Sequence, residues 1–404
     1  MNLKFSKISV ILFIELFLLY HIVFVSFPYI YKYTIIQKIA TIGLFIMILP
    51  CSLRCFKKMS IGIKFLVISY ITILVISAII NRNDLVMTNT LVGGTIYAIT
   101  LFELFGVFSN VVEKRSIGFL VRIFLFFTFF YVFINDILII MKPDIFANGY
   151  YFIGNKFSVA YKHLELIVLF FMNHEINISN KKKPKKILFN ISIFILATIT
   201  VMISYQVNTM TGVISVMILG IIILFFRDKL LYNPIFFVVI LVSSSAFTML
   251  SDMVLSWSPV QNFIVNILHR DLTLTGRLAI YANVPKLIQG HLLFGYGYNS
   301  AYEVWTNYVW YMPNAQNGLI NCIFEQGLIA TVILVLLVAR IIFKSHKSLQ
   351  MQKIYKPLIA LLYVYAILGA IEITIDIAFV GWSVLLYTIT LLPDKLVHKN
   401  NFRK

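Results

Sequence analysis

The chain has 404 residues, of which 60% are hydrophobic and only 12% are charged, and its mean hydropathy is +0.91. Soluble domains carry about 45–50% apolar and about 25% charged residues, and disordered chains are poor in apolar residues. The composition therefore excludes both classes and predicts an all-α polytopic membrane protein. A formal net charge of +18 is then typical of basic cytoplasmic loops rather than of a nucleic-acid partner.

Twelve apolar segments have roughly the length of a transmembrane helix, which needs about 20 residues. The first nine lie in 1–251, a long extracytoplasmic loop covers 252–317, and three further spans with a basic tail fill 318–404. The predicted spans are 8–30, 35–52, 61–80, 87–109, 117–141, 156–173, 187–205, 208–226, 233–251, 318–343, 356–375 and 377–393.

Lysine and arginine predict the orientation. If the N-terminus lies inside, most of the 34 Lys and Arg residues fall in inner segments, as cytoplasmic loops require. Both termini are then cytoplasmic. The run from Lys181 to Lys186 is interpreted as a topology anchor, with contact to anionic lipids as the alternative. Cys51, Cys55 and Cys322 form neither a disulfide framework nor a metal site, and we expect no cofactor.

The long loop 252–317 is rich in Trp and Tyr, so we expect it to be structured. It forms either an interfacial aromatic belt or a surface on which sugar rings stack. Ile280, Tyr281, Val284, Leu287 and Ile288 share one face of a predicted helix.

Thr273 or Thr275 can cap the start of this helix, where free N–H groups and the helix dipole favour anions. Arg277 falls in its first turn and would add a bidentate phosphate ligand. An Arg that reaches toward lipid headgroups is the alternative.

Further polar residues follow toward the end of the loop. The segment from His291 to Gly297 contains two glycines, Gly295 and Gly297, which indicate a tight turn or a close backbone approach. Gln316, Asn317 and Glu325 then lie near the outer end of the next span. Ionisable residues at such positions are functional-site candidates by default.

The sixth span also begins with polar residues. Lys156, Lys162 and His163 would form a second cationic wall for a lipid diphosphate. The alternative is an interfacial pair of lysines that Glu165 balances. Four acidic residues in other spans are expected to form internal polar pairs or to line a cavity: Glu103, Asp136, Glu372 and Asp376.

The order of these features over 273–345 resembles the O-antigen ligase/polymerase family, and within it the Wzy-type polymerases of bacterial capsules and O-antigens. The features are Arg277 before an amphipathic helix, the glycine segment from His291 to Gly297, and Gln316-Asn317 and Glu325-x-Gly327 before an apolar span. The resemblance implies a glycosyltransferase in the bacterial cytoplasmic membrane. Donor and acceptor would be glycans on undecaprenyl diphosphate, and no metal would take part. A chain-length regulator and a flippase would be its partners, besides membrane lipids.

The family usually has His where this chain has Gln316, and Gln cannot exchange a proton near neutral pH. Glu325 is our first expectation for the base, with Asp271, His269 and His291 as alternatives. The predicted site residues divide into two sets. Those expected in catalysis are Arg277, Glu325, Asn317 and Gln316. Those expected to bind substrate are Lys156, Lys162, His163, His291, Gly295, Gly297 and Tyr281.

Three other functions stay open. A ligase of the same family would move finished glycan to another acceptor. A flippase or transporter for lipid-linked sugars would also suit twelve spans, although transporters usually bind near the membrane midplane on broken helices. A structural or signalling protein would leave the Arg277 helix start unexplained. The sequence has neither a P-loop nor a dinucleotide fingerprint.

Overall fold

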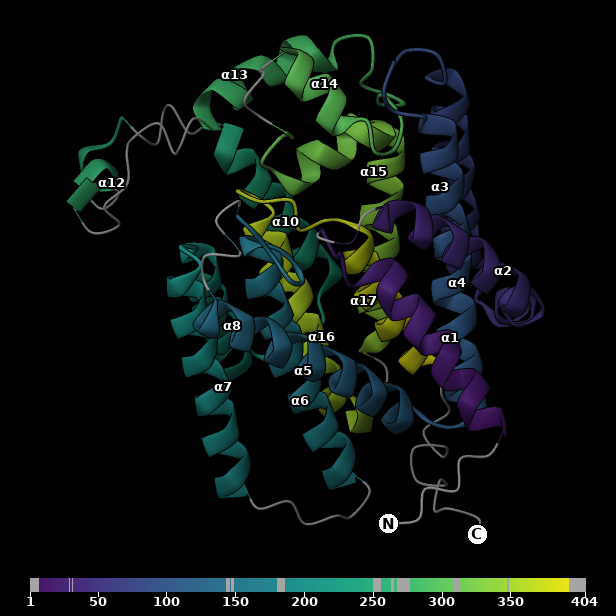
Figure 1. Cartoon of the computed structure of the whole chain (residues 1–404), viewed down its shortest axis with the longest axis vertical. Coiled ribbons are helices and arrows are strands. Elements are labelled where there is room, and N and C mark those ends of the chain that lie inside the picture. Colours follow the sequence, from purple (N-terminus) through teal and green to yellow (C-terminus); the bar gives the residue numbers. More distant parts are fainter. Residues whose placement is uncertain are drawn as a thin grey trace.

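The computed structural model describes residues 7–28, 30, 32–142, 146, 149–179, 186–249, 256–262, 265–266, 277–308, 313–346 and 349–391. Every one of the twelve predicted segments contains a helix (Figure 1). These helices are α1 (Lys7–Val23), α2 (Tyr33–Lys58), α3 (Ile61–Ile80), α4 (Thr90–Lys114), α5 (Ile117–Met141), α6 (Lys156–Ser179), α7 (Lys186–Gln206), α8 (Met210–Phe225), α10 (Pro234–Met249), α15 (Gly318–Ser345), α16 (Leu349–Leu368) and α17 (Ile377–Thr390).

Six helices are long and apolar enough to cross a membrane, namely α2, α3, α4, α5, α7 and α15. Four more, α1, α8, α10 and α17, are apolar but shorter. The chain is therefore a multi-pass helical membrane protein. Twelve crossings stay a prediction, as do the positions of the termini. The lysine run at 181–185 and the basic tail at 395–404 lie outside the described residues.

Two predicted spans end earlier in the structure than in the sequence prediction. The segment 8–30 is helical only to Val23. Pro28 opposes its continuation, because it has no N–H to donate to the Phe24 carbonyl and disfavours helical geometry at Phe27. The segment 356–375 is helical only to Leu368, and Gly369 begins a turn. Both corrections matter, because the two non-helical stretches come together in the site below.

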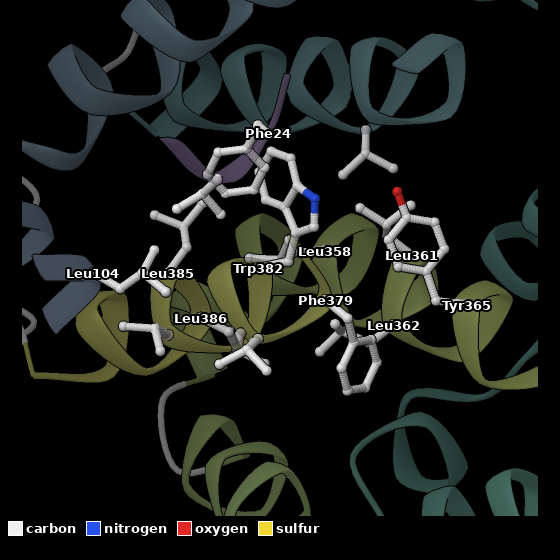
Figure 2. Close-up of a cluster of buried hydrophobic side chains, with 14 of the residues drawn as sticks. Phe24, Leu104, Leu358, Leu361, Leu362, Tyr365, Phe379, Trp382, Leu385 and Leu386 are labelled. Carbon is white, nitrogen blue, oxygen red and sulfur yellow. The ribbon is translucent and has the colours of Figure 1, made fainter. Parts of the chain in front are cut away.

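The buried core lies around α4, α6, α16 and α17, while α2 and α7 present many apolar side chains on the outside. Figure 2 shows part of this core, in which Phe24, Leu104 and Trp382 pack against the leucines of α16 and α17. The ring centroids of Phe24 and Trp382 lie 4.8 Å apart. Apolar faces turned outward suit lipid, since a membrane bundle need not bury them.

A second, smaller core lies at one end of the bundle. It is built by α13 (Arg277–Ile288), α14 (Ala301–Tyr308) and the start of α15, which meet around Trp305 and Phe324. Figure 1 shows α13 and α14 lying over that end. The predicted amphipathic helix is confirmed, because Ile280, Val284 and Leu287 are buried in this core. The loop 252–317 also holds α12 (Ser258–Asn262).

Three small elements complete the described chain. The hairpin of β1 (Tyr150–Tyr151) and β2 (Gly154–Asn155) precedes α6, and the short α9 (Asp228–Leu231) precedes α10. Several helices begin at a side chain that accepts hydrogen bonds from their first turn, as Asn, Ser and Asp do at N-caps. These capping residues include Asn89, Ser116, Asn233, Asn317 and Asp376.

Candidate functional site

A partly open cavity of about 260 Å³ lies where three parts of the chain meet. They are the end of α1 with the residues that follow it (Ile22 to Ser26), the first three turns of α6, and the segment from Ile373 to Ala378 that leads into α17. Gln37, Ile153 and Tyr365 complete the lining. The same connection region touches the start of α15, because the Gly318 N–H donates to the Gly369 carbonyl at 2.7 Å. The cavity therefore lies at the end of the bundle that carries α13 and α14.

A buried ion pair forms one wall of the cavity. Lys162 Nζ lies 2.5 Å from Glu165 Oε2, and the two side chains are only 6% and 2% exposed. The residues are three positions apart on α6, a spacing that brings side chains together on one helix face. The ammonium also lies 5.5 Å from the centre of the Phe24 ring. This arrangement fixes the position of a cation that is expensive to bury alone.

Glu165 is held from the opposite side by two donors of the core. Tyr365 donates its hydroxyl to Glu165 Oε1 at 3.0 Å, and Trp382 donates its Nε1–H to the same oxygen at 3.1 Å. Figure 2 shows Trp382 and Tyr365 within the apolar cluster, where the indole nitrogen and the phenol oxygen are the polar atoms drawn. The carboxylate thus accepts three hydrogen bonds and has a fixed orientation.

Asp376 supplies a second carboxylate to the cavity. It is the N-cap of α17, where its Oδ1 accepts from the N–H groups of Ala378 and Phe379, each at 3.0 Å. Its side chain is exposed and lines the cavity. Among the described residues, no hydrogen bond to its Oδ2 was found.

The connection between α16 and α17 places Asp376 within electrostatic reach of Lys162 and Glu165. One ammonium and two carboxylates line the cavity, so its formal charge is −1 when all three are ionised. Such a set favours a neutral ligand with many hydroxyl groups over an anion. Carboxylates accept hydrogen bonds strongly, and Tyr161 and Gln37 add polar groups to the lining.

The predicted cationic wall of three residues does not form. Lys162 lines the cavity, whereas Lys156 places its ammonium 5.3 Å from the Phe157 ring and His163 Nε2 lies 3.1 Å from Asp136 Oδ1. The reason is helix geometry. Successive residues are rotated by about 100°, and residues six apart by about 120°, so the three side chains leave α6 in different directions. The alternative of a lysine balanced by Glu165 is confirmed for Lys162, as is an internal pair for Asp136.

The segment from His291 to Gly297 forms a close backbone junction with α15, as its glycines predicted. Gly295 (φ 66°) and Gly327 (φ 81°) both have left-handed backbone, and Gly327 interrupts the helical geometry of α15. A Cβ on Gly327 would lie 2.2 Å from the Leu293 carbonyl oxygen. A Cβ on Gly297 would lie 2.7 Å from Thr90. These glycines and His291, which stacks on Tyr296 at 3.7 Å, contact protein.

Four other predicted site residues lie near the start of α15. Asn317 is fully buried and caps α15, and its Nδ2 donates to the Ala370 carbonyl at 3.2 Å. Gln316 bonds to Asn314, and its carbonyl accepts from the Tyr281 hydroxyl at 3.2 Å. Glu325 accepts from the backbone N–H groups of Asn299 and Ala301, just before and at the start of α14. All four are thus engaged by nearby protein groups.

The described part of α13 runs from Arg277, whose side chain lies outside the described residues, as do Thr273, Thr275, His269 and Asp271. The predicted phosphate ligand and its place in the first turn of this helix therefore stay predictions.

Sequence reasoning missed two features of this end of the molecule. One is the pair of donors, Tyr365 and Trp382, that orients Glu165. The other is Glu303, a 3% exposed carboxylate that accepts from the backbone N–H groups of 86–88 and so ties α14 to the connection between α3 and α4. An acid on an amphipathic helix carries no signal for such a contact. Asp376 before an apolar run does carry one, because Asp is a strong N-cap residue.

Comparisons with models of protein families, with curated proteins and with solved structures found no match to this chain.

Proposed function

We propose that this chain is a membrane glycosyltransferase that polymerises undecaprenyl-diphosphate-linked oligosaccharide repeats on the outer face of the bacterial cytoplasmic membrane. The observation that supports the proposal is the cavity beside Lys162, Glu165 and Asp376 at one end of an apolar bundle. A lipid-linked sugar stays anchored in the bilayer, so its polar head needs a hydrophilic cavity at the end of the membrane helices. The layer of α13 and α14 lies at that same end.

The reaction joins an acceptor hydroxyl to the anomeric carbon of a lipid-linked donor and releases the lipid diphosphate. The energy comes from the activated donor, so the protein contributes positioning and stabilisation of the leaving charge. For the leaving diphosphate we assign Arg277 at the start of α13, where the first N–H groups and the dipole of the helix favour an anion.

The test is deletion of the gene followed by electrophoresis of surface and lipid-linked glycans. Complementation with wild type should restore a ladder of polymer, and Arg277→Ala should not. Arg54→Ala is the matched control, because Arg54 is an exposed arginine of α2. Protein levels in the membrane are compared for all three.

Each alternative function gives a different gel. Single repeat units on the outer face with no ladder would support the polymerase. If the deletion strain accumulates long lipid-linked chains that never reach a final acceptor, the protein is a ligase. If repeat units stay on the cytoplasmic side, it is a flippase. Normal polymer from Arg277→Ala at wild-type level would remove Arg277 from the mechanism.

A further inference from the structure

We propose that the cavity binds the acceptor sugar and that Asp376 is the general base that removes the proton of its attacking hydroxyl group. This inference rests on the proposed glycosyl transfer and assigns its acceptor subsite. It also fills a gap left by the sequence, where Gln316 stands at a position that cannot supply a base.

The two carboxylate oxygens of Asp376 have different surroundings: one caps α17, and the other is available to a ligand in the cavity. Oδ1 accepts both N-cap hydrogen bonds, from Ala378 and Phe379. The exposed side chain lies in the wall of the cavity, and no described residue was found to donate to Oδ2. A base must reach a hydroxyl at hydrogen-bond distance, and this oxygen is the group in the cavity that can do so while the cap stays intact.

The other described carboxylates near this end are less suited to the role. Glu165 accepts three hydrogen bonds, from Lys162, Tyr365 and Trp382. Glu325 accepts from the backbone N–H groups of Ala301 and Asn299, at and just before the start of α14, and does not line the cavity. Glu303 accepts from the N–H groups of 86–88 and also lies outside the lining. A carboxylate whose lone pairs are already in use is a poor proton acceptor.

The surroundings hold Asp376 in a state that can exchange a proton. The Asp376 side chain is open to the cavity, but the protein around the cavity partly desolvates it and raises its pKa to about 6. The N–H of Phe379 and the charge of Lys162 act to lower this pKa, and Glu165 acts to raise it. A base with a pKa just below neutral is ionised at pH 7 and still takes up a proton efficiently. The titratable groups that face it from the neighbouring elements are Lys162 and Glu165 of α6, Tyr365 of α16, Tyr97 of α4, Cys322 of α15, and Tyr298.

Size and polarity of the cavity suit one sugar ring. Pockets for drug-sized ligands measure about 300–1,000 Å³, so a cavity of about 260 Å³ takes the terminal sugar and leaves the remaining repeat outside. Tyr161, Ser158 and Gln37 offer hydrogen-bonding groups, and Phe24 offers an apolar ring face. The rigid ion pair of Lys162 and Glu165 presents fixed charges to the sugar hydroxyls.

The chemical step then balances. The acceptor hydroxyl gives its proton to Asp376 Oδ2, and its oxygen forms a bond to the anomeric carbon of the donor. The bond between that carbon and the phosphate oxygen breaks, and its electron pair leaves with the lipid diphosphate. Asp376 afterwards returns the proton to water at the open side of the cavity.

The decisive experiment measures initial rates of the full-length protein in lipid nanodiscs with a synthetic lipid-diphosphate-linked repeat unit. Asp376→Asn retains the N-cap, because an Asn side-chain oxygen accepts the same N–H groups. We expect kcat to fall about 10²–10⁴-fold, the usual contribution of a general base, with KM changed little. The matched control is Asp228→Asn, an exposed aspartate of α9.

The pH profile provides a second readout that needs no variant. Wild-type kcat should rise about tenfold per pH unit below pH 6 and level off above it, since only ionised Asp376 acts as a base. Asp376→Ser also retains a side chain that can cap the helix. It replaces Asp376→Asn in the experiment if that variant does not accumulate in the membrane. Both variants should lose the acid limb of the profile.

Three outcomes would overturn the inference. Wild-type kcat and an unchanged acid limb in Asp376→Asn would remove Asp376 as the base and leave the polymerase standing. A rise in KM with kcat unchanged would make Asp376 a binding residue only. Wild-type protein that forms no polymer in any condition would instead refute the proposed function on which the inference rests.

Discussion

The buried pair of Lys162 and Glu165 gives the sharpest energetic prediction. Replacing Glu165 by Gln keeps its shape but leaves the Lys162 ammonium without its counter-charge in a site that is 6% exposed. Removal of one partner of a buried pair costs about 3–5 kcal/mol. Tyr365 and Trp382 both donate to Glu165 Oε1, so the amide carbonyl oxygen of Gln would take the place of this atom. The amide NH₂ group would then face the Lys162 ammonium. Asp376 compensates part of the ammonium charge, and we therefore expect about 3 kcal/mol.

The double variant Lys162→Met with Glu165→Gln should behave differently. Both charges disappear together, and replacement of a whole buried pair by neutral residues is often nearly neutral. We expect the double variant to cost less than either single variant, which corresponds to a coupling free energy of at least about 2 kcal/mol. The single Lys162→Met should cost about as much as Glu165→Gln, because it leaves an unpaired carboxylate.

The assay is unfolding by SDS titration in mixed micelles, followed by circular dichroism. The control cycle uses Lys58 and Glu113, whose charged atoms lie 2.7 Å apart but whose side chains are 59% and 43% exposed. Exposed pairs contribute about 0–1 kcal/mol, so Lys58→Met and Glu113→Gln should be nearly additive. Additive effects in the buried cycle as well would refute the reasoning.

Two further predictions concern the layer at the end of the bundle. Burial acts to raise the pKa of Glu303, but the N–H donors of 86–88 outweigh it and lower the pKa. The stabilisation by ionised Glu303 is thus present above the ordinary pKa of Glu and is lost as the pH falls through the lowered pKa. The rate of amide hydrogen exchange at 86–88 should therefore rise only in acid in the wild type, whereas Glu303→Gln should raise this rate already at pH 7. Equal exchange rates in the variant and the wild type at pH 7 would contradict the contact. Gly327→Ala should destabilise the protein by more than about 2 kcal/mol, because the new Cβ meets the Leu293 carbonyl oxygen. Gly43→Ala meets nothing within 4 Å and should be neutral or slightly stabilising in the same SDS titration.

Much of the fold could be predicted because hydropathy reports directly on helices. The lipid-facing and core-facing residues of a membrane helix are both apolar, so each of the twelve apolar segments contains a helix. The helix ends were less accurate. α2 continues to Lys58, beyond the predicted end at residue 52, because the backbone can stay helical after the apolar run has ended. Conversely, α1 and α16 end before Pro28 and Gly369, inside apolar runs. Hydropathy does not detect these ends, although the proline and the glycine are signals for them.

The site was predicted in part. Lys162 was expected to bind, and Asp376 to form an internal pair or line a cavity, because charged residues in apolar segments are costly and usually serve a purpose. Their meeting could not be predicted, since α6 and the connection before α17 are separated by about 200 residues of chain. His163 illustrates the same limit. Its partner Asp136 lies on α5, and only packing shows that this histidine points away from the cavity.

The choice of aspartate at position 376 is the strongest argument that the residue does more than begin a helix. Ser and Asn cap a helix about as well as Asp does, and the other side-chain caps found among the described residues are Asn89, Ser116, Asn155, Asn233 and Asn317. A neutral cap would avoid placing a second carboxylate in a desolvated site beside Glu165. Both the desolvation and the charge of Glu165 act to raise the pKa of Asp376. Capping does not distinguish the three residues and the helix dipole favours a carboxylate, so the desolvation of the charge is the term that favours Asn or Ser at this position. A carboxylate that lines the cavity at this cap is explained if it has to take up a proton there.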